Sequence, residues 1–323
     1  MLAIRRFALA ALALALLGLQ LTTAAPIPGV KAGGDDGDKW LLDEAEMIMV
    51  FNFKQMFDSK LMKSGYTEKM REAMMNNPQA KEMADKLGLD LTKDIDSIII
   101  SGGKQKDTPK GRFVLKGNFD IEKLSKAMKS SDKVKASKEG SIEVFEVEMQ
   151  GANGYGAFAG KNAFILTESK ETTVALAKSA PEKASTLNKD VKAALATFTG
   201  KESMAMVMVV TDELKGMAAM NKQVEAAVKS LSTLTASITV EDGITLKLVG
   251  NTTDAKSAAS LEKQLTGLKA IAEIGLGMAE MVPPVAKEVF ESLKIDKTRD
   301  SVIVTLPITK DQIEKAAKLA PGG

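Results

Sequence analysis

The sequence contains no cysteine and no histidine. Without cysteine there is no disulfide and no thiol nucleophile. Without histidine the chain lacks the most common general base and the usual ligands of zinc and haem. A Ser-His-Asp triad is therefore excluded, and any catalysis would depend on Asp, Glu, Lys, Tyr or Ser. We find no catalytic residues, no cofactor-binding loop and no metal ligands in a recognisable pattern, and we expect a protein that is not an enzyme.

The chain also has a small net charge and few arginines. The chain has 44 basic and 42 acidic residues, and the basic ones include Arg5 and Arg6 near the N-terminus. Apart from these two, the only arginines are Arg71, Arg112 and Arg299. A neutral chain has no electrostatic attraction to nucleic acid or to an anionic membrane, and bidentate recognition of phosphate or guanine favours arginine. We therefore expect no nucleic-acid partner.

The first residues have the pattern of an export signal. Arg5 and Arg6 precede an uncharged apolar run over residues 7–19, and small residues follow at 22–25. This order is typical of a cleavable signal peptide, predicted here for residues 1–24. An uncleaved membrane anchor is the alternative, but the run is shorter than the roughly 20 apolar residues that span a bilayer. We expect an extracytoplasmic protein, periplasmic or secreted, without a stable membrane span after cleavage.

Residues 25–39 are rich in Pro, Gly and Asp, which is typical of a flexible linker. Asp35, Asp36 and Asp38 could bind calcium weakly, but the other ligands of a calcium loop are missing. We interpret this segment as a solvated linker.

From Trp40 onward, strand-like and helix-like segments alternate, which predicts an α+β fold. Two stretches with the same order of elements, residues 40–180 and 188–323, look like diverged copies. In both, a strand ends in Gly-Asn, at Gly117 and at Gly250, and an Asp then begins a helix. The order contains the βαββαβ pattern of ferredoxin-like units, which predicts mostly antiparallel sheets with helices on one face. We expect the two repeats to pack together and bury their open sheet faces.

Several local features can be predicted in detail. Asp120 and Asp254 are expected to cap helices, and Thr309 with Gln312 to form a capping box. Apolar residues at helical spacing predict a helix from Thr211 through Leu231. The hairpin around Gly243 keeps one face apolar only with a three-residue loop, which pairs Val240 with Ile244 and would place Gly243 in a left-handed conformation.

Three segments resemble a known group of proteins. They are Trp40-Leu-Leu-Asp-Glu-Ala-Glu, Phe53-Lys-Gln-Met-Phe-Asp-Ser and Asp90-Leu-Thr-Lys-Asp-Ile-Asp-Ser-Ile. The chain resembles, over about the first third of its mature length, uncharacterised secreted proteins of planctomycete bacteria. This resemblance implies no activity and no functional residue.

Methionines alternate along two predicted strands, at Met47 and Met49 and again at Met204, Met206 and Met208. Thioethers are soft ligands for Cu(I), but the same spacing is typical of one buried strand face. Core packing is the favoured interpretation.

Other candidate sites are weaker. Gly151, Gly154, Gly156 and Gly160 precede a strand rather than a helix, so turns or a bulge are favoured over a phosphate-binding loop. Asp94 and Asp96 flank the start of a strand, where Asp is common for turn reasons, although paired carboxylates can also catalyse hydrolysis. Residues 268–293 are apolar but regularly interrupted by charges, which favours a helix over a sheet rather than a membrane span.

These observations leave three functional hypotheses. The first is an exported, cysteine-free protein that binds a partner or has a structural role. The second is a carrier of an apolar ligand, such as a lipid, in a groove between the sheet and Met-rich helices. The third is a carboxylate-dependent hydrolase.

Overall fold

The computed structural model describes residues 40–319, except 77–80, 82–88, 91, 106–107, 150–151, 179–184, 219–221 and 279–281. The predicted signal peptide (1–24), the predicted linker (25–39) and Gly151 lie outside the described residues.

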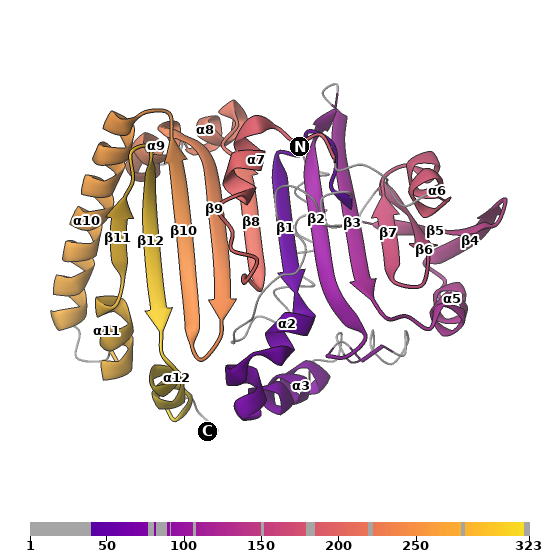
Figure 1. Ribbon diagram of the computed structural model, residues 1–323, viewed down its shortest axis with the longest axis horizontal. Helices are drawn as coiled ribbons and strands as arrows, with labels where there is room; N and C mark the ends of the chain where they lie inside the picture. The colour runs from indigo at the N-terminus through magenta and orange to yellow at the C-terminus, as the bar shows by residue number, and fades with distance from the viewer. Residues whose placement is uncertain are drawn as a thin grey trace.

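One antiparallel sheet of 12 strands runs through the molecule (Figure 1). Its strand order is β11-β12-β10-β9-β8-β1-β2-β3-β7-β6-β5-β4. The strands are β1 (Met47–Asn52), β2 (Ile95–Gln105), β3 (Thr108–Gly117), β4 (Val134–Glu139), β5 (Ile142–Met149), β6 (Ala152–Ala159), β7 (Ala163–Thr167), β8 (Met204–Val209), β9 (Leu231–Val240), β10 (Ile244–Thr252), β11 (Lys294–Lys297) and β12 (Ser301–Ile308).

Helices connect and cover these strands. They are α2 (Phe53–Asp58), the π-helix η2 (Met62–Tyr66), α3 (Thr67–Asn76), α5 (Ile121–Lys129), α6 (Lys170–Lys178), α7 (Lys189–Leu195), α8 (Asp212–Ala218), α9 (Lys222–Lys229), α10 (Ala255–Met278), α11 (Pro284–Glu291) and α12 (Lys310–Ala317). The predicted α+β class and the antiparallel sheet are confirmed.

The two halves of the chain meet where β1 pairs with β8 (Figure 1). Outward from this seam, the order β1-β2-β3-β7 matches the order β8-β9-β10-β12, and β4 and β5 form an additional hairpin in the first half. The repeats therefore join edge to edge, and the expectation that their open faces bury one another is wrong. Backbone pairing at the seam replaces face-to-face packing as the link between them.

The finer ferredoxin-like order is also not found. A split βαβ unit makes the two strands joined by its helix parallel and places a third strand between them, whereas β1 and β2, which flank α2 and α3, pair directly and are antiparallel. The same order of elements along the chain is compatible with both arrangements, so the order alone did not distinguish them.

Helices cover both faces of the sheet, contrary to the expectation of one. On one face, the segment from Trp40 to Ala45 and helix α7 pack against Ile48, Val50 and Val207, which are 0–2% exposed. On the other face, α8, α9 and α10 pack around Leu231, Leu261 and their neighbours. The helical pattern could not show which face each helix covers.

Local predictions were mostly confirmed. The side chains of Asp120 and Asp254 accept hydrogen bonds from the backbone at the starts of α5 and α10, and the Thr309–Gln312 capping box is present. The helix predicted through Leu231 instead ends earlier, because Leu231 is the first residue of β9 and packs beneath α10.

The hairpin between β9 and β10 has the predicted register, with Val240 opposite Ile244. The left-handed conformation predicted for Gly243 is wrong, because the glycines with positive φ are Gly65, Gly140, Gly160 and Gly200. Glycine is required at position 243 for a different reason. A Cβ atom there would lie 2.5 Å from the carbonyl oxygen of Ile308.

Gly117, in the first of the two Gly-Asn pairs, allows an even closer approach of the backbone. A Cβ atom at this position would lie 2.0 Å from the carbonyl oxygen of Asp94 and 2.9 Å from the ring of Phe119. The glycine therefore lets the end of β3 pack directly on the loop that leads into β2.

We expect Gly117→Ala to lower the free energy of unfolding by about 2 kcal/mol, because backbone and a ring must move to accommodate one methyl group. The control is Gly267→Ala in α10, where a Cβ atom meets nothing within 4 Å. That change should stabilise the helix by up to about 1 kcal/mol. Urea denaturation of both variants measures this, and equal effects would contradict the steric explanation.

Candidate functional site

One row of residues that crosses the sheet is apolar from edge to edge. The register places one residue from each of the twelve strands in a continuous row, and none of them is polar. The row is Ile295, Val304, Leu248, Ala236, Met206, Met49, Ile100, Phe113, Leu166, Gly156, Phe145 and Ala136.

A second row on the same face is also entirely apolar. It consists of Leu306, Leu246, Ile238, Met204, Phe51, Ile98, Leu115, Phe164 and Phe158. We call the side of the sheet that carries these two rows the apolar face. Side chains alternate between the two faces of a strand. The rows are apolar because the pairing register places the apolar positions of neighbouring strands opposite one another.

The opposite face differs in composition. The row that contains Ile48 and Val207 ends in Asp296 at one edge of the sheet and in Glu146 and Lys135 at the other. We call it the mixed face. Its centre is a tightly buried core and its margins are charged, as expected for a face that is covered in the middle and solvated at the sides.

Much of the apolar face is less completely covered. Helices α8, α9 and α10 pack on it around Leu234, and α2 and α12 pack around Ile238. Between these groups of helices Leu248 is 42% exposed, and Met204 and Met206 are half-buried. Folded proteins rarely expose large contiguous apolar surfaces without a binding role.

Helix α10, which borders this face, is itself incompletely covered. Its first half is buried through Ala258 and Leu261, whereas Leu268, Ile271 and Ile274 in its second half are 61–68% exposed. The predicted helix within residues 268–293 is thus found in two pieces, α10 and α11, followed by the short strand β11 that the pattern did not predict. No described helix is long and apolar enough to cross a membrane.

The predicted Met-rich strands meet at the seam. Met47 lies opposite Met208, and Met49 lies opposite Met206. All four therefore project from the apolar face, with Met204 in the neighbouring row. The sequence identified these methionines but could not show that the two groups, more than 150 residues apart, come together.

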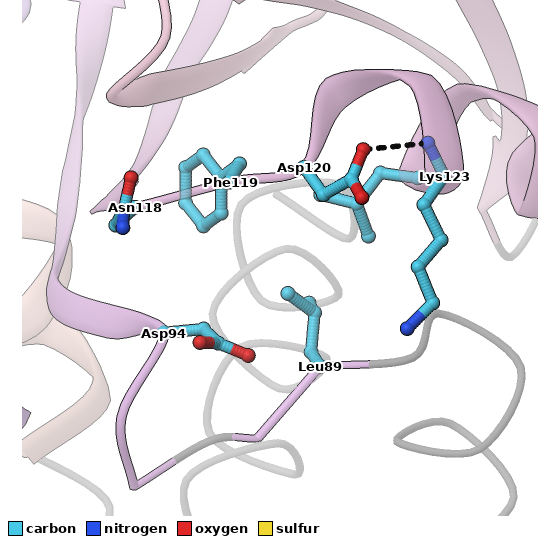
Figure 2. Close-up of a pocket in the computed structure, with 7 residues that line it drawn as sticks. Leu89, Asp94, Asn118, Phe119, Asp120 and Lys123 are labelled. Carbon is cyan, nitrogen blue, oxygen red and sulfur yellow. Dashed lines mark hydrogen bonds between the residues drawn. The ribbon is translucent and has the colours of Figure 1, made fainter.

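A separate pocket of about 410 Å³ lies at the end of β3 (Figure 2). Asp94, Asn118, Asp120 and Lys123 supply polar groups, and Leu89, Phe119 and Leu124 supply apolar ones. Asp120 was predicted as a helix cap, but its proximity to Asp94 was not predicted. It follows from the close approach of β3 to the β2 loop at Gly117.

The pocket carboxylates have structural partners. Asp94 Oδ2 accepts a hydrogen bond from the backbone amide of Asp90 at 2.7 Å, and Asp120 Oδ1 accepts one from the amide of Lys123 at 3.0 Å. Asp96 pairs instead with Lys54 at 3.8 Å. The structure thus does not unite the predicted Asp94–Asp96 pair, and it gives each carboxylate in the pocket a turn-stabilising or capping role.

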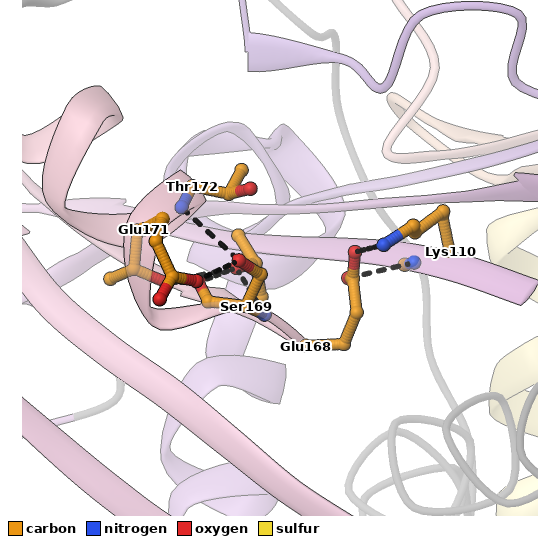
Figure 3. Close-up of polar contacts among 8 residues, drawn as sticks. Lys110, Glu168, Ser169, Glu171 and Thr172 are labelled. Carbon is orange, nitrogen blue, oxygen red and sulfur yellow. Dashed lines mark hydrogen bonds and ion pairs between the residues drawn. The ribbon is translucent and has the colours of Figure 1, made fainter. Parts of the chain in front are cut away.

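A second polar group lies at the junction of β7 and α6 (Figure 3). Glu168 pairs with Lys110 at 3.1 Å and accepts a hydrogen bond from the amide of Gly111 at 3.2 Å. Ser169 donates to Glu171 at 2.8 Å and accepts weakly from the amide of Thr172. Since these contacts close the turn into α6, they explain why the polar residues gather there.

Near Glu168, Arg112 holds the segment after Trp40 onto the mixed face. Its Nη1 donates to the carbonyl oxygen of Leu41 at 2.7 Å. Burial lowers the pKa of Arg112, while the charges of Asp43 and Glu168 act in the opposite direction. This guanidinium is therefore the charged anchor of the N-terminal segment in a largely apolar core.

The prediction of turns or a bulge in the glycine-rich stretch is confirmed at Gly160 but not at Gly154 or Gly156. Gly154 and Gly156 lie within β6, and Gly160 has a φ of 62° in the turn before β7. A Cβ atom at Gly156 would lie 2.4 Å from the ring of Phe164. Among the described residues, no group of three or more Asp or Glu side chains could hold a metal ion.

Comparison with known proteins yields similarity at the level of the fold. No family model and no curated protein matches the chain. Crystal form III of TP0453, a Treponema protein, matches with a TM-score of 0.53 and 11% identity, over 90% of this chain and 100% of that one. Crystal form IV matches with a TM-score of 0.50 and 9% identity, over 91% and 97%. The predicted resemblance to planctomycete proteins stays a prediction.

We expect Arg112→Met to lower the free energy of unfolding by about 2 kcal/mol, because a hydrogen bond from a charged donor is lost. Trp40 is 7% exposed and is the sole tryptophan, so its fluorescence should shift to longer wavelength as the segment loosens. Arg299→Met is the matched control, since the Arg299 side chain is 89% exposed. An unchanged Trp40 spectrum in the Arg112 variant would contradict the anchoring role.

Asp90 makes the pocket loop sensitive to pH. Partial burial acts to raise the pKa of Asp90, but hydrogen bonds from Thr92 and Lys93 and the charge of Arg71 outweigh it and hold the pKa below its usual value. The stabilisation is present above the usual carboxyl pKa and is lost as the pH falls through the lower folded-state value.

We therefore expect Asp90→Asn to cost about 1 kcal/mol near neutral pH and progressively less below about pH 4. Urea denaturation across this range measures the difference. Asp96→Asn is the control, because the Asp96–Lys54 pair is long and exposed and should contribute little at any pH. A cost for Asp90→Asn that persists in acid would refute the assignment.

Proposed function

We propose that this protein binds an apolar ligand, such as the hydrocarbon chain of a lipid, on the apolar face of its sheet. The observation that carries the proposal is the uninterrupted apolar row across all 12 strands, with Leu248 left 42% exposed within it. A protein that only needed a core would be expected to cover this row as completely as it covers Ile48 and Val207.

The chemistry of the face fits such a ligand. Neither apolar row contains a charge or a hydrogen-bonding side chain, so a polar ligand would lose its hydration without gaining partners. Met204 and Met206 lie near the centre, and the flexible thioether side chain adapts to ligands of different shapes. The exposed residues Leu268, Ile271 and Ile274 on α10 add apolar surface beside the face.

The same reasoning bears on the alternatives. A binding or structural role towards a protein partner would use the same surface, and we treat a lipid chain as the favoured occupant because neither apolar row carries a polar group to orient a protein. The hydrolase hypothesis is less well supported, since Asp94 and Asp120 both accept backbone hydrogen bonds that stabilise local structure. From the predicted signal peptide we further propose that the protein acts outside the cytoplasm. From the lack of histidine, cysteine and a catalytic motif in the sequence we propose that it is not an enzyme.

A direct test is to extract the purified protein with organic solvent and to identify bound lipids by mass spectrometry. The delipidated protein is then titrated with cis-parinaric acid, a fluorescent fatty acid. We expect saturable binding, and the absence of both extracted lipid and binding would refute the proposal.

We expect Leu248→Gln to weaken cis-parinaric acid binding about tenfold, because an amide at this position must be desolvated when the ligand covers it. Leu319→Gln is the matched control: Leu319 is 59% exposed, beyond α12 and outside both apolar rows. It should leave the affinity unchanged. Equal weakening by both substitutions would place the ligand elsewhere.

A further inference from the structure

The methionines at the seam form a cluster whose geometry follows from the backbone. The amide of Val209 donates to the carbonyl of Glu46 at 2.7 Å, and the amide of Asn52 donates to that of Ser203 at 2.8 Å. These bonds identify Glu46–Val209 and Asn52–Ser203 as hydrogen-bonded pairs. In an antiparallel ladder such pairs alternate with pairs that exchange no hydrogen bond, where opposite side chains are closest.

Met47–Met208 and Met49–Met206 fall on the closer type of pair. Opposite Cα atoms are then about 4.5 Å apart, and the two pairs are successive on one face, about 7 Å along the strands. Four flexible thioethers thus originate within a small patch. Met204, in the next row and opposite Phe51, adds a fifth within reach.

We propose that this cluster binds a soft monovalent metal ion, Cu(I) or Ag(I), through the thioether sulfurs of Met47, Met49, Met206 and Met208. Thioethers are soft ligands that select Cu(I) over hard cations. The metal site and the proposed lipid site share the side chains of Met49 and Met206, but they take different ligands, so each proposal is tested by its own titration.

Accessibility also fits the assignment. Met49 is 8% exposed, whereas Met47, Met206 and Met208 are half-buried. Since thioethers are neutral, a bound monovalent ion keeps its charge, and a fully dry site would penalise it. Half-buried ligands leave that charge close to solvent. Gly102, opposite Met47 on β2, adds no side chain that would crowd this end of the cluster.

The packing explanation and the metal explanation make different predictions for Met→Leu substitutions. Leucine keeps the volume and the apolar character of methionine, so the exchange costs little stability. It removes the sulfur completely. A cluster that serves only packing would therefore be indifferent to the change in any metal-binding assay.

The experiment is an anaerobic titration of the delipidated full chain with Cu(I) in competition with bicinchoninate, repeated with Ag⁺. We expect one ion bound more tightly than micromolar, with a first coordination shell of sulfur only in X-ray absorption. Met49→Leu combined with Met206→Leu should lose this binding, while a thermal melt shows that the variant remains folded. The control Met128→Leu, on α5 and outside the sheet, should bind as the wild type does.

Two results would overturn the proposal: a wild-type protein that binds neither ion more tightly than micromolar, or a double variant that binds as the wild type does. Leu248→Gln, which alters the proposed lipid site two strands away from Met206, should bind either ion as the wild type does. Weakened fatty-acid binding with retained metal binding in Leu248→Gln therefore separates the two proposals, and failure of one does not imply failure of the other.

Discussion

The pairing of β1 with β8 is the interaction on which the rest of the structure depends. These two strands are the innermost of their respective halves, and their register aligns every row of residues on one side of the seam with a row on the other. A shift by one residue would place Met47 and Met49 on the face opposite to Met206 and Met208, because side chains alternate along a strand. The continuity of both faces thus depends on this one register.

The register is supported on the mixed face as well. Ile48 lies opposite Val207 and Val50 lies opposite Ala205, and all four are at most 3% exposed beneath α7 and the segment after Trp40. Burial of these four side chains stabilises only the observed pairing, since a register shifted by one residue would bring methionines into this core. The tightly packed face therefore holds the seam in place, and this leaves the other face free to be less completely covered.

How far the sequence predicts this arrangement depends on the range of the contacts involved. Local patterns were sufficient for the ends of β5, β7 and α6, for the caps at Asp120 and Asp254, and for the β9–β10 register, where one face had to remain apolar. They were misleading at Leu231, whose helical spacing to earlier residues is coincidental. Strand β11, with the sequence Lys-Ile-Asp-Lys, carries too little apolar pattern to be recognised.

The candidate site required contacts that no local pattern contains. The two methionine groups could be identified separately, and so could the capping role of Asp120, but the meeting of Met49 with Met206 and of Asp94 with Asp120 depends on pairings distant in sequence. The preference for core packing at the methionines was reasonable for an isolated strand. It assumed that a buried face would be covered, whereas an edge-to-edge junction of two repeats doubles the width of the sheet without adding a second layer. The apolar face is thus a consequence of how the halves join, and for that reason we look for the function there rather than in the polar pocket.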